Sequence, residues 1–104
     1  MSSFENVTIS RNANIYFDGQ VTSRTIHFAN GEKKTLGIML PGEFRFNTDS
    51  RELMEIQQGD VSVKLDGQND WEHFASGSSF EVAESSAFDI RVNSVTDYCC
   101  SYLD

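Results

Sequence analysis

Few side chains in this sequence are of the types that bind transition metals or carry redox chemistry. The only histidines, His27 and His73, lie far apart, and the only cysteines, Cys99 and Cys100, are adjacent. Neighbouring residues on a strand point to opposite faces, so an ordinary disulfide between these cysteines is geometrically poor. We interpret the histidines as surface or rim residues and the cysteines as strand residues, one of which packs inward. A histidine-based metal centre and a redox dithiol are not expected.

Motifs for phosphate loops and nucleophilic catalysis are also missing from the sequence. There is no Gly-x-Gly-x-x-Gly element, no Gly-Lys-Ser/Thr loop and no arrangement typical of a Ser/His/Asp triad. The formal net charge is −8, which repels nucleic-acid polymers and anionic lipid surfaces. A small anion can still bind where arginines and backbone N–H groups reverse the field locally. We therefore expect a small ligand, and neither a nucleic-acid polymer nor a membrane as partner.

Length and composition predict one domain. The 104 residues, of which 38% are hydrophobic and 12% aromatic, suffice for a single core, and no run approaches the roughly 20 apolar residues of a membrane span. The start, Met1 to Asn6, lacks the basic residues and apolar run of a secretion signal. We expect a cytoplasmic location, with which unpaired cysteines agree.

Alternation of apolar and polar residues predicts strands throughout the chain. Turn signals such as Asn30-Gly31 and Pro41-Gly42 separate the runs, and about eight to ten short strands in a chain of this length are typical of a closed or sandwiched antiparallel sheet. The run 49–57 is too short for a convincing helix, so we expect 53–57 to form a hairpin with 61–65. The first dozen residues are predicted to be a loose or partner-docked arm. The expected strands are 21–28, 36–40, 43–47, 53–57, 61–65, 80–82, 88–92 and 98–103.

Two glycine-anchored segments resemble the paired motifs of the cupin superfamily. The first runs from Gly37 through Glu43 and Arg45 to Glu52 and Gly59, and the second from Gly77 through Ala83, Ser85 and Phe88 to Val92. In metal-dependent cupins the ligands occupy the positions that are here Glu43, Arg45, Glu52 and Phe88. Guanidinium and phenyl groups do not ligate metals, so only the two glutamates retain donors. The resemblance implies an all-β, cupin-type jelly-roll barrel.

A series of short pieces over nearly the whole chain matches one family within that superfamily. The pieces are Ile15 to Gly19, Gly37 to Thr48, Glu52 to Met54, Gly59 to Val63, Trp71, Gly77 to Val82, Ser86 to Phe88 and Tyr98 to Leu103. Through them the chain resembles the small bacterial pyrimidine/purine nucleoside phosphorylases. The resemblance implies phosphate-dependent cleavage of nucleosides to free base and ribose 1-phosphate, without a cofactor or metal. It covers a cupin-like domain at 15–104 after an N-terminal extension at 1–14, and we expect a homodimer.

Arginine and glutamate at the former ligand positions suit phosphorolysis. A cupin directs these positions into the barrel mouth, so we expect Arg45 to contact phosphate and Glu43 and Glu52 to bind the ribose hydroxyls or to protonate the base. Arg91 has the strand parity opposite to Phe88, so the two point inward together only across a bulge. The alternatives are an exposed Arg45 paired with an acidic residue, and buried glutamates that pair with Arg45 for structure.

Aromatic residues offer the flat wall that a base needs. Most of them are expected in the core, whereas Phe88, at a former ligand position, is the candidate stacking partner and Tyr102 could reach base or phosphate with its hydroxyl. Thr48 and Ser86 would donate to phosphate or cap a loop. The candidates are Glu43 and Arg45 as catalytic residues, and Thr48, Glu52, Phe80, Ser86, Phe88, Arg91 and Tyr102 as substrate-binding residues.

Two other functions compete with the phosphorylase. A non-catalytic cupin that binds a small metabolite would be stabilised by a ligand that it never consumes. A metal enzyme that uses Glu43 and Glu52 would lose activity to a chelator, although two carboxylates alone rarely hold a transition metal.

Overall fold

The computed structural model describes residues 3–103, which fold as nine strands and one short 3-10 helix. No helix among these residues is long and apolar enough to cross a membrane. The elements are β1 (Thr8–Ile9), β2 (Asn14–Tyr16), η1 (Phe17–Gly19), β3 (Val21–His27), β4 (Lys33–Met39), β5 (Gly42–Asn47), β6 (Arg51–Leu65), β7 (Glu72–Ala75), β8 (Ser79–Val82) and β9 (Ala87–Leu103).

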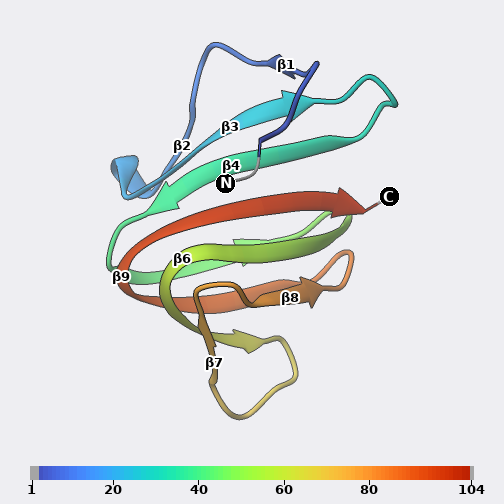
Figure 1. Cartoon of the computed structure of the whole chain (residues 1–104). Helices are drawn as coiled ribbons and strands as arrows, with labels where there is room; N and C mark the ends of the chain where they lie inside the picture. The colour runs from blue at the N-terminus through green and yellow to red at the C-terminus, as the bar shows by residue number, and fades with distance from the viewer. Residues whose placement is uncertain (1–2, 104) are drawn as a thin grey trace.

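The strands form one antiparallel sheet that curls on itself. Its main path is β1-β3-β4-β9-β6-β7, and β2, β5 and β8 pair with β3, β9 and β6 respectively. The long strands β6 and β9 bend together at one end of the molecule, with β3 and β4 on one side of them and β7 and β8 on the other (Figure 1). This is the all-β barrel that the sequence predicted.

The predicted hairpin between 53–57 and 61–65 is wrong. Both runs belong to the continuous strand β6, which pairs with β9 from Arg51 to Leu65, and the predicted strands 88–92 and 98–103 likewise merge into β9. The register of the β6–β9 ladder shifts between Ile56 and Val61. Residues Gln58, Gly59 and Asp60, which lie between the two runs, therefore form a bulged bend in one strand, and not a reversal of the chain.

Gly59 makes this bend possible. Its φ is +128°, and a Cβ there would lie 2.7 Å from the Thr96 Cα on β9. Because the bulge takes the Gly59 backbone out of the ladder, the Ser76 hydroxyl bonds both its N–H (2.9 Å) and its carbonyl (3.2 Å). Gly59 is therefore required by the close approach of two bent strands, and not by a hairpin turn.

The N-terminal segment is not a loose arm. Within it, β1 and β2 both pair with β3, with Thr8 opposite His27 and Asn14 opposite Ser23. The Asn14 amide also donates to the Ser23 hydroxyl at 3.1 Å. The extension therefore completes one edge of the sheet and lies beside β3 (Figure 1).

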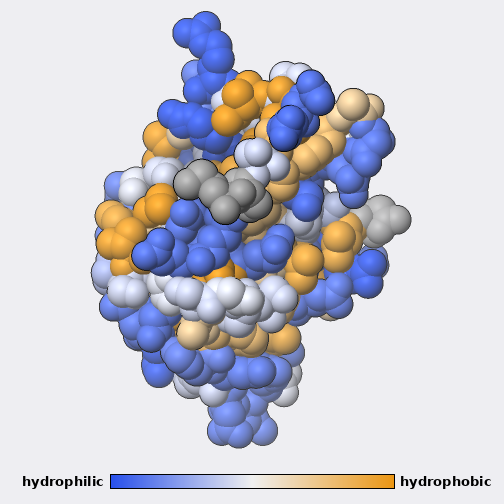
Figure 2. All heavy atoms as spheres, viewed as in Figure 1, coloured by the Kyte–Doolittle hydropathy of each residue, from blue (hydrophilic) through white to orange (hydrophobic). Residues whose placement is uncertain are grey.

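The core fills the inside of the curled sheet. Both cysteines are free and buried, and only Cys100 belongs to this inner core, as expected for neighbours on a strand. His27 is exposed, and His73 contacts Asp60 at the surface. The core members are Val21, Met39, Phe44, Met54, Ile56, Val61, Val63, Phe80, Val82, Phe88, Ile90, Val92, Tyr98 and Cys100. Figure 2 shows the contrasting exterior, where hydrophilic side chains predominate and apolar ones gather near η1 and the end of β4.

Candidate active site

A cavity of about 130 Å³ opens inside the curled sheet. Strand alternation builds it, because every second residue of a strand faces the interior. Thr35, Cys100 and Met54 stand in one cross-strand row on β4, β9 and β6, and Tyr102 and Glu52 form the next row. The lining residues are Tyr16, Ser23, Thr35, Met39, Phe46, Asn47, Glu52, Met54, Phe88, Tyr98, Cys100 and Tyr102.

Among residues 3–103, Glu52 is the only charged side chain that lines this cavity. Burial raises the pKa of its carboxyl group above the ordinary glutamate value, and the carboxylate of Asp49 adds to the rise. The Cys100 thiol, 3.5 Å from the carboxylate, and the Lys33 ammonium act in the opposite direction. The cavity therefore holds a carboxyl group that retains its proton to higher pH than an exposed glutamate does.

Hydroxyl groups share the lining of the cavity with this carboxyl group. Tyr98 and Tyr102 line the cavity from β9, and burial raises the pKa of both phenols, which keeps them protonated as hydrogen-bond donors. The Tyr98 hydroxyl reaches the Thr22 carbonyl at 3.4 Å. Ser23 and Thr35 add two buried hydroxyls from β3 and β4. Such a lining matches a small ligand that carries several hydroxyl groups.

Aromatic rings form the opposite wall of the cavity. Phe88 is 1% exposed and stacks on Phe46, with ring centroids 5.5 Å apart and planes inclined by 26°. Phe80 lies against Phe88 at 5.8 Å without lining the cavity, so it supports the wall from the core. Phe17, held at a φ of +52°, packs edge-on against Phe46 at 5.4 Å. The flat surface that the sequence predicted is present, and Phe88 is part of it.

Thr48 and Ser86 are joined by loop hydrogen bonds. The Thr48 hydroxyl donates to the Ala83 carbonyl at 2.6 Å and accepts from the Ser86 N–H at 2.9 Å, and Thr48 is 5% exposed. Neither residue lines the cavity. Of the two roles considered for them, the geometry matches the loop cap.

Glu43, Arg45 and Arg91 lie on the outer face of the barrel, so the expectation that Glu43 and Arg45 point into the mouth is wrong. Arg45 bonds Asp66 at 2.9 Å and Asp89 at 3.1 Å, and its side chain is 51% exposed. Arg91 lies 3.4 Å from Glu43 and 4.0 Å above the Trp71 ring. The reason is the pleat of β5, where Phe44 and Phe46 occupy the inward positions.

The former ligand positions thus divide between the two faces. Glu52 and Phe88 line the cavity, whereas Glu43 faces solvent with 66% of its side chain exposed. The two carboxylates considered as metal donors therefore do not face each other. Within the described part of the chain, no three His, Cys, Asp or Glu side chains come together as metal ligands.

Sequence reasoning missed most of the polar lining. Tyr16, Ser23, Thr35 and Asn47 were not among the candidates, and Cys100 and Tyr98 were treated as strand residues only. The signal that could have found the lining is strand parity. Once Tyr102 is placed inward, Cys100 and Tyr98 follow at two-residue spacing.

Relatives of this chain share one description. A sequence profile described as pyrimidine/purine nucleoside phosphorylase matches residues 11–102. The proteins of that name from Geotalea uraniireducens and Chlorobium chlorochromatii are 58% and 56% identical to this chain, over 100% and 99% of both sequences respectively.

Solved structures share the architecture. A crystal structure of a protein of unknown function from Acinetobacter sp. ADP1 is 39% identical, with a TM-score of 0.94 over 97% of this chain and 98% of that one. An RmlC-like cupin from Shewanella frigidimarina, 14% identical, matches with a TM-score of 0.70 over 97% of this chain and 86% of its own and shows the fold alone. With a cupin barrel and full-length relatives above half identity, this chain belongs to the pyrimidine/purine nucleoside phosphorylase family.

Proposed function

We propose that this protein cleaves purine and pyrimidine nucleosides with inorganic phosphate, giving the free base and ribose 1-phosphate. The observation that carries the proposal is the cavity that places the Glu52 carboxyl group, several hydroxyl groups and the Phe46–Phe88 wall around one space. Family membership supplies the reaction class. The lining supplies groups for each part of a nucleoside, namely hydrogen-bonding partners for ribose and a flat apolar face for the base.

In this reaction a phosphate oxygen forms a bond to C1′ while the bond from C1′ to the base nitrogen breaks, and the electron pair leaves with the base. The transition state is oxocarbenium-like, so catalysis needs a fixed sugar and a proton or hydrogen bond for the departing base. We assign the ribose hydroxyls to Glu52 first, with protonation of the base as its other role. Tyr98 and Tyr102 would donate to ribose or base from the same wall.

The stacking surface suits a broad range of bases. Stacking on Phe88 and Phe46 uses the ring face, which every base has, and so does not distinguish purines from pyrimidines. We therefore expect uridine, adenosine and guanosine all to be substrates.

The geometry does not favour Glu43 and Arg45, the two residues that the sequence suggested as catalytic. Each is engaged with charged partners on the outer face, away from the cavity. We therefore move the proposed catalytic centre to the cavity residues Glu52, Tyr98 and Tyr102.

The direct test is to incubate the pure protein with uridine, adenosine or guanosine, with and without phosphate, and to follow free base by chromatography. Phosphate-dependent release is expected, and its absence for all three nucleosides would sink the proposal. A nucleoside that raises the melting temperature without being consumed would instead favour the non-catalytic binder.

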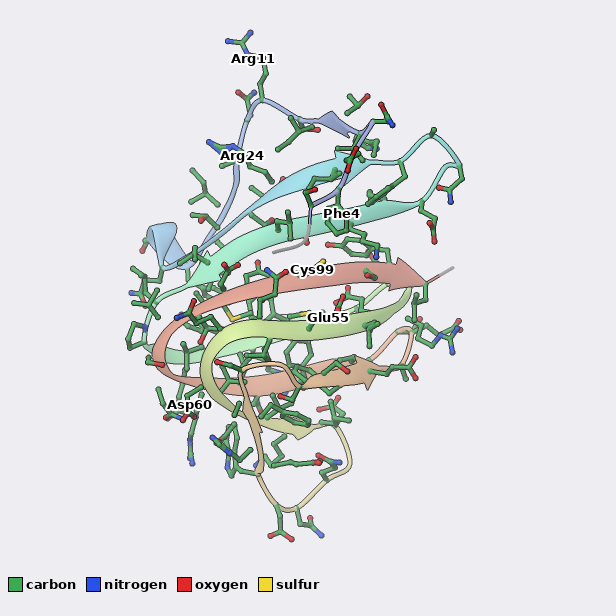
Figure 3. All side chains as sticks on the ribbon, viewed as in Figure 1. Phe4, Arg11, Arg24, Glu55, Asp60 and Cys99 are labelled. Carbon is green, nitrogen blue, oxygen red and sulfur yellow. The ribbon has the colours of Figure 1, made fainter. Side chains whose placement is uncertain are left out.

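Glu52 can be tested against a matched control on the same strand. Glu55 lies three residues further along β6, beside Cys99 (Figure 3), and does not line the cavity. Glu52→Gln keeps a hydrogen-bonding group but cannot deliver a proton, so an about 100-fold or larger drop in turnover, the usual size of acid catalysis, would assign it to protonation. A smaller drop with a raised KM for the nucleoside would assign it to ribose. If Glu52→Gln behaves like Glu55→Gln, Glu52 has neither role.

We also propose a homodimer, whose interface we place on β2 and β4. The strand 98–103 is no free edge, because β9 is paired with β4 and β6 on its two sides there. Exposed apolar residues instead stand in a row across β2 and β4, where Ile15 and Ile38 both flank Thr22. Light scattering after gel filtration should show twice the chain mass, and an Ile38→Glu variant should show the mass of one chain.

A further inference from the structure

Phosphorolysis needs a site for the phosphate dianion, and the cavity described above does not supply one. In the part of the chain that the structure describes, its one charged lining group is the Glu52 carboxyl group, and the remaining lining is neutral. A dianion placed beside an acidic group and without a cation would be held poorly. If the proposed function is correct, the phosphate must enter from a neighbouring region that carries positive charge.

A second hollow adjoins the first and shares Tyr102 with it. It has a volume of about 540 Å³ and lies between the β3–β4 turn, the beginning of β6 and the end of β9. Two cations, Lys33 and Arg51, line it. The full lining is Asn30, Gly31, Glu32, Lys33, Arg51, Tyr102 and Leu103.

Lys33 stands at the boundary between the two hollows. Its ammonium nitrogen lies 4.6 Å from the centroid of the Tyr102 ring, which lines both hollows. The same charge acts on the Glu52 carboxyl group, whose pKa it lowers against the effect of burial. An anion bound by Lys33 would therefore lie next to whatever occupies the inner cavity.

The acid that lines this hollow, Glu32, is already engaged. The Glu32 carboxylate accepts a hydrogen bond from the Asn30 side-chain amide at 2.8 Å, and the Glu32 backbone N–H donates to the Asn30 side-chain oxygen Oδ1 at 3.0 Å. Both groups are thus held within the turn. Glu32 does not form an ion pair with Lys33 or Arg51 in the part of the chain that the structure describes.

The other basic residues among residues 3–103 line neither hollow. Arg45 and Arg91 are paired with carboxylates on the outer face. Arg11, in the loop between β1 and β2, and Arg24 on β3 project outward (Figure 3). By contrast, Lys33 and Arg51 form no ion pair among residues 3–103, so their charges are available to a ligand.

We propose that Lys33 and Arg51 form the phosphate subsite, and that Tyr102 separates it from the nucleoside subsite. This inference rests on the proposed function and deepens it. Phosphate held by the two cations directs one oxygen past Tyr102 to C1′ of the ribose, the glycosidic bond breaks, and its electron pair leaves with the base. Arg51 offers a planar fork for two phosphate oxygens, and Lys33 supplies a point charge.

The test compares the KM for phosphate in Lys33→Gln, Arg51→Gln and the control Arg24→Gln, each of which removes one positive charge. Loss of one charge-assisted contact should raise the KM for phosphate about tenfold, and loss of both about 100-fold. The KM for uridine should change less than twofold in all three, and the control should match the wild type. Lys33→Arg should recover most of the phosphate affinity.

The failure of this inference can be told apart from the failure of the proposed function. If the wild-type protein releases base with phosphate but both Gln variants keep its KM for phosphate, the subsite is overturned and the function stands. If the wild type releases no base, calorimetric titration with inorganic phosphate decides alone. Binding that the Lys33→Gln and Arg51→Gln variants weaken supports the subsite, and no binding, or equal binding in all variants, overturns it. Circular dichroism confirms that each variant is folded.

Discussion

Replacing Gly59 by alanine should destabilise the protein far more than the same change at Gly77. Both glycines have positive φ values, +128° and +88° respectively. A Cβ at Gly59 would meet the Thr96 Cα at 2.7 Å and the Thr96 Cβ at 2.9 Å, whereas a Cβ at Gly77 has nothing within 4 Å. The pair therefore separates the cost of an unfavourable backbone conformation from the cost of a clash.

The expected magnitudes follow from these two terms. The backbone term is about 1–2 kcal/mol at either site, partly offset by the lower entropy of the unfolded alanine chain. The clash with β9 adds about 1–3 kcal/mol at Gly59, because backbone atoms cannot move aside as a flexible side chain does. We expect a loss of about 2–4 kcal/mol for Gly59→Ala and about 1 kcal/mol for Gly77→Ala.

Urea unfolding followed by Trp71 fluorescence or circular dichroism measures both. With a slope of about 1.5 kcal/mol per molar urea, the midpoints of the two variants should differ by about 0.7–2 M. Equal midpoints would refute the view that Gly59 is required by close approach of β6 to β9. Gly59→Ala should also lower activity, because the bend sets the direction in which Glu52 and Met54 enter the cavity.

Three further outcomes are expected. Because burial raises the pKa of Glu52, the folded state binds the Glu52 proton more tightly than the unfolded chain does. The stability that this contributes is present below the ordinary glutamate pKa and is lost as pH rises through the pKa of the folded state. Between pH 4 and 8, the melting temperature of Glu52→Gln should therefore fall less toward high pH than that of the wild type. Arg45→Ala should leave turnover and the KM for phosphate within twofold of wild type in the same assay, because its partners are surface carboxylates, and a tenfold loss would restore Arg45 to the catalytic centre. Gly37→Ala should raise the KM for nucleosides and lower the melting temperature, because its Cβ would lie 2.9 Å from the Tyr98 ring and would press on the Thr22 carbonyl; unchanged values of both would mean that the Tyr98 ring position matters little.

Local patterns in the sequence predicted many of the strand residues, but they missed β1, β2 and β7 and could not predict how the strands join. Alternation identified 21–28 and 43–47 almost to the residue, since a half-buried strand shows its pattern locally. Local alternation could not predict that the two runs in β6 form one continuous strand. A Gly-Asp pair inside a hydrophobic run fits a hairpin turn as well as a bulge, and only the partner strand β9, some 40 residues later in the chain, decides between them.

Three candidates on the long strands, Glu52, Phe88 and Tyr102, line the cavity. Arg91 on β9 and the two candidates on β5 lie on the outer face instead. Glu43 and Arg45 were placed inward by analogy with metal-dependent cupins, although the phenylalanines between and beyond them signal the opposite parity. Burying Phe44 and Phe46 while pairing Arg45 with two carboxylates in solvent is the cheaper arrangement, since an inward arginine would need a buried anion at all times.

This reversal of β5 also bears on where phosphate can bind. With Arg45 outside, no cation among the described residues lines the inner cavity, and a positively charged interior would in any case oppose an oxocarbenium-like sugar. In the proposed arrangement the two substrates are separated by charge. The nucleoside occupies the hydroxyl-lined cavity, and phosphate lies beside Lys33 and Arg51 at its rim. The cations then hold phosphate on one side of C1′ while the Phe46–Phe88 wall receives the base. On β9, Tyr102 lies at the rim of the cavity and Tyr98 lies further inside. Their order along the strand would set the direction in which the phosphate oxygen approaches C1′ and the base departs.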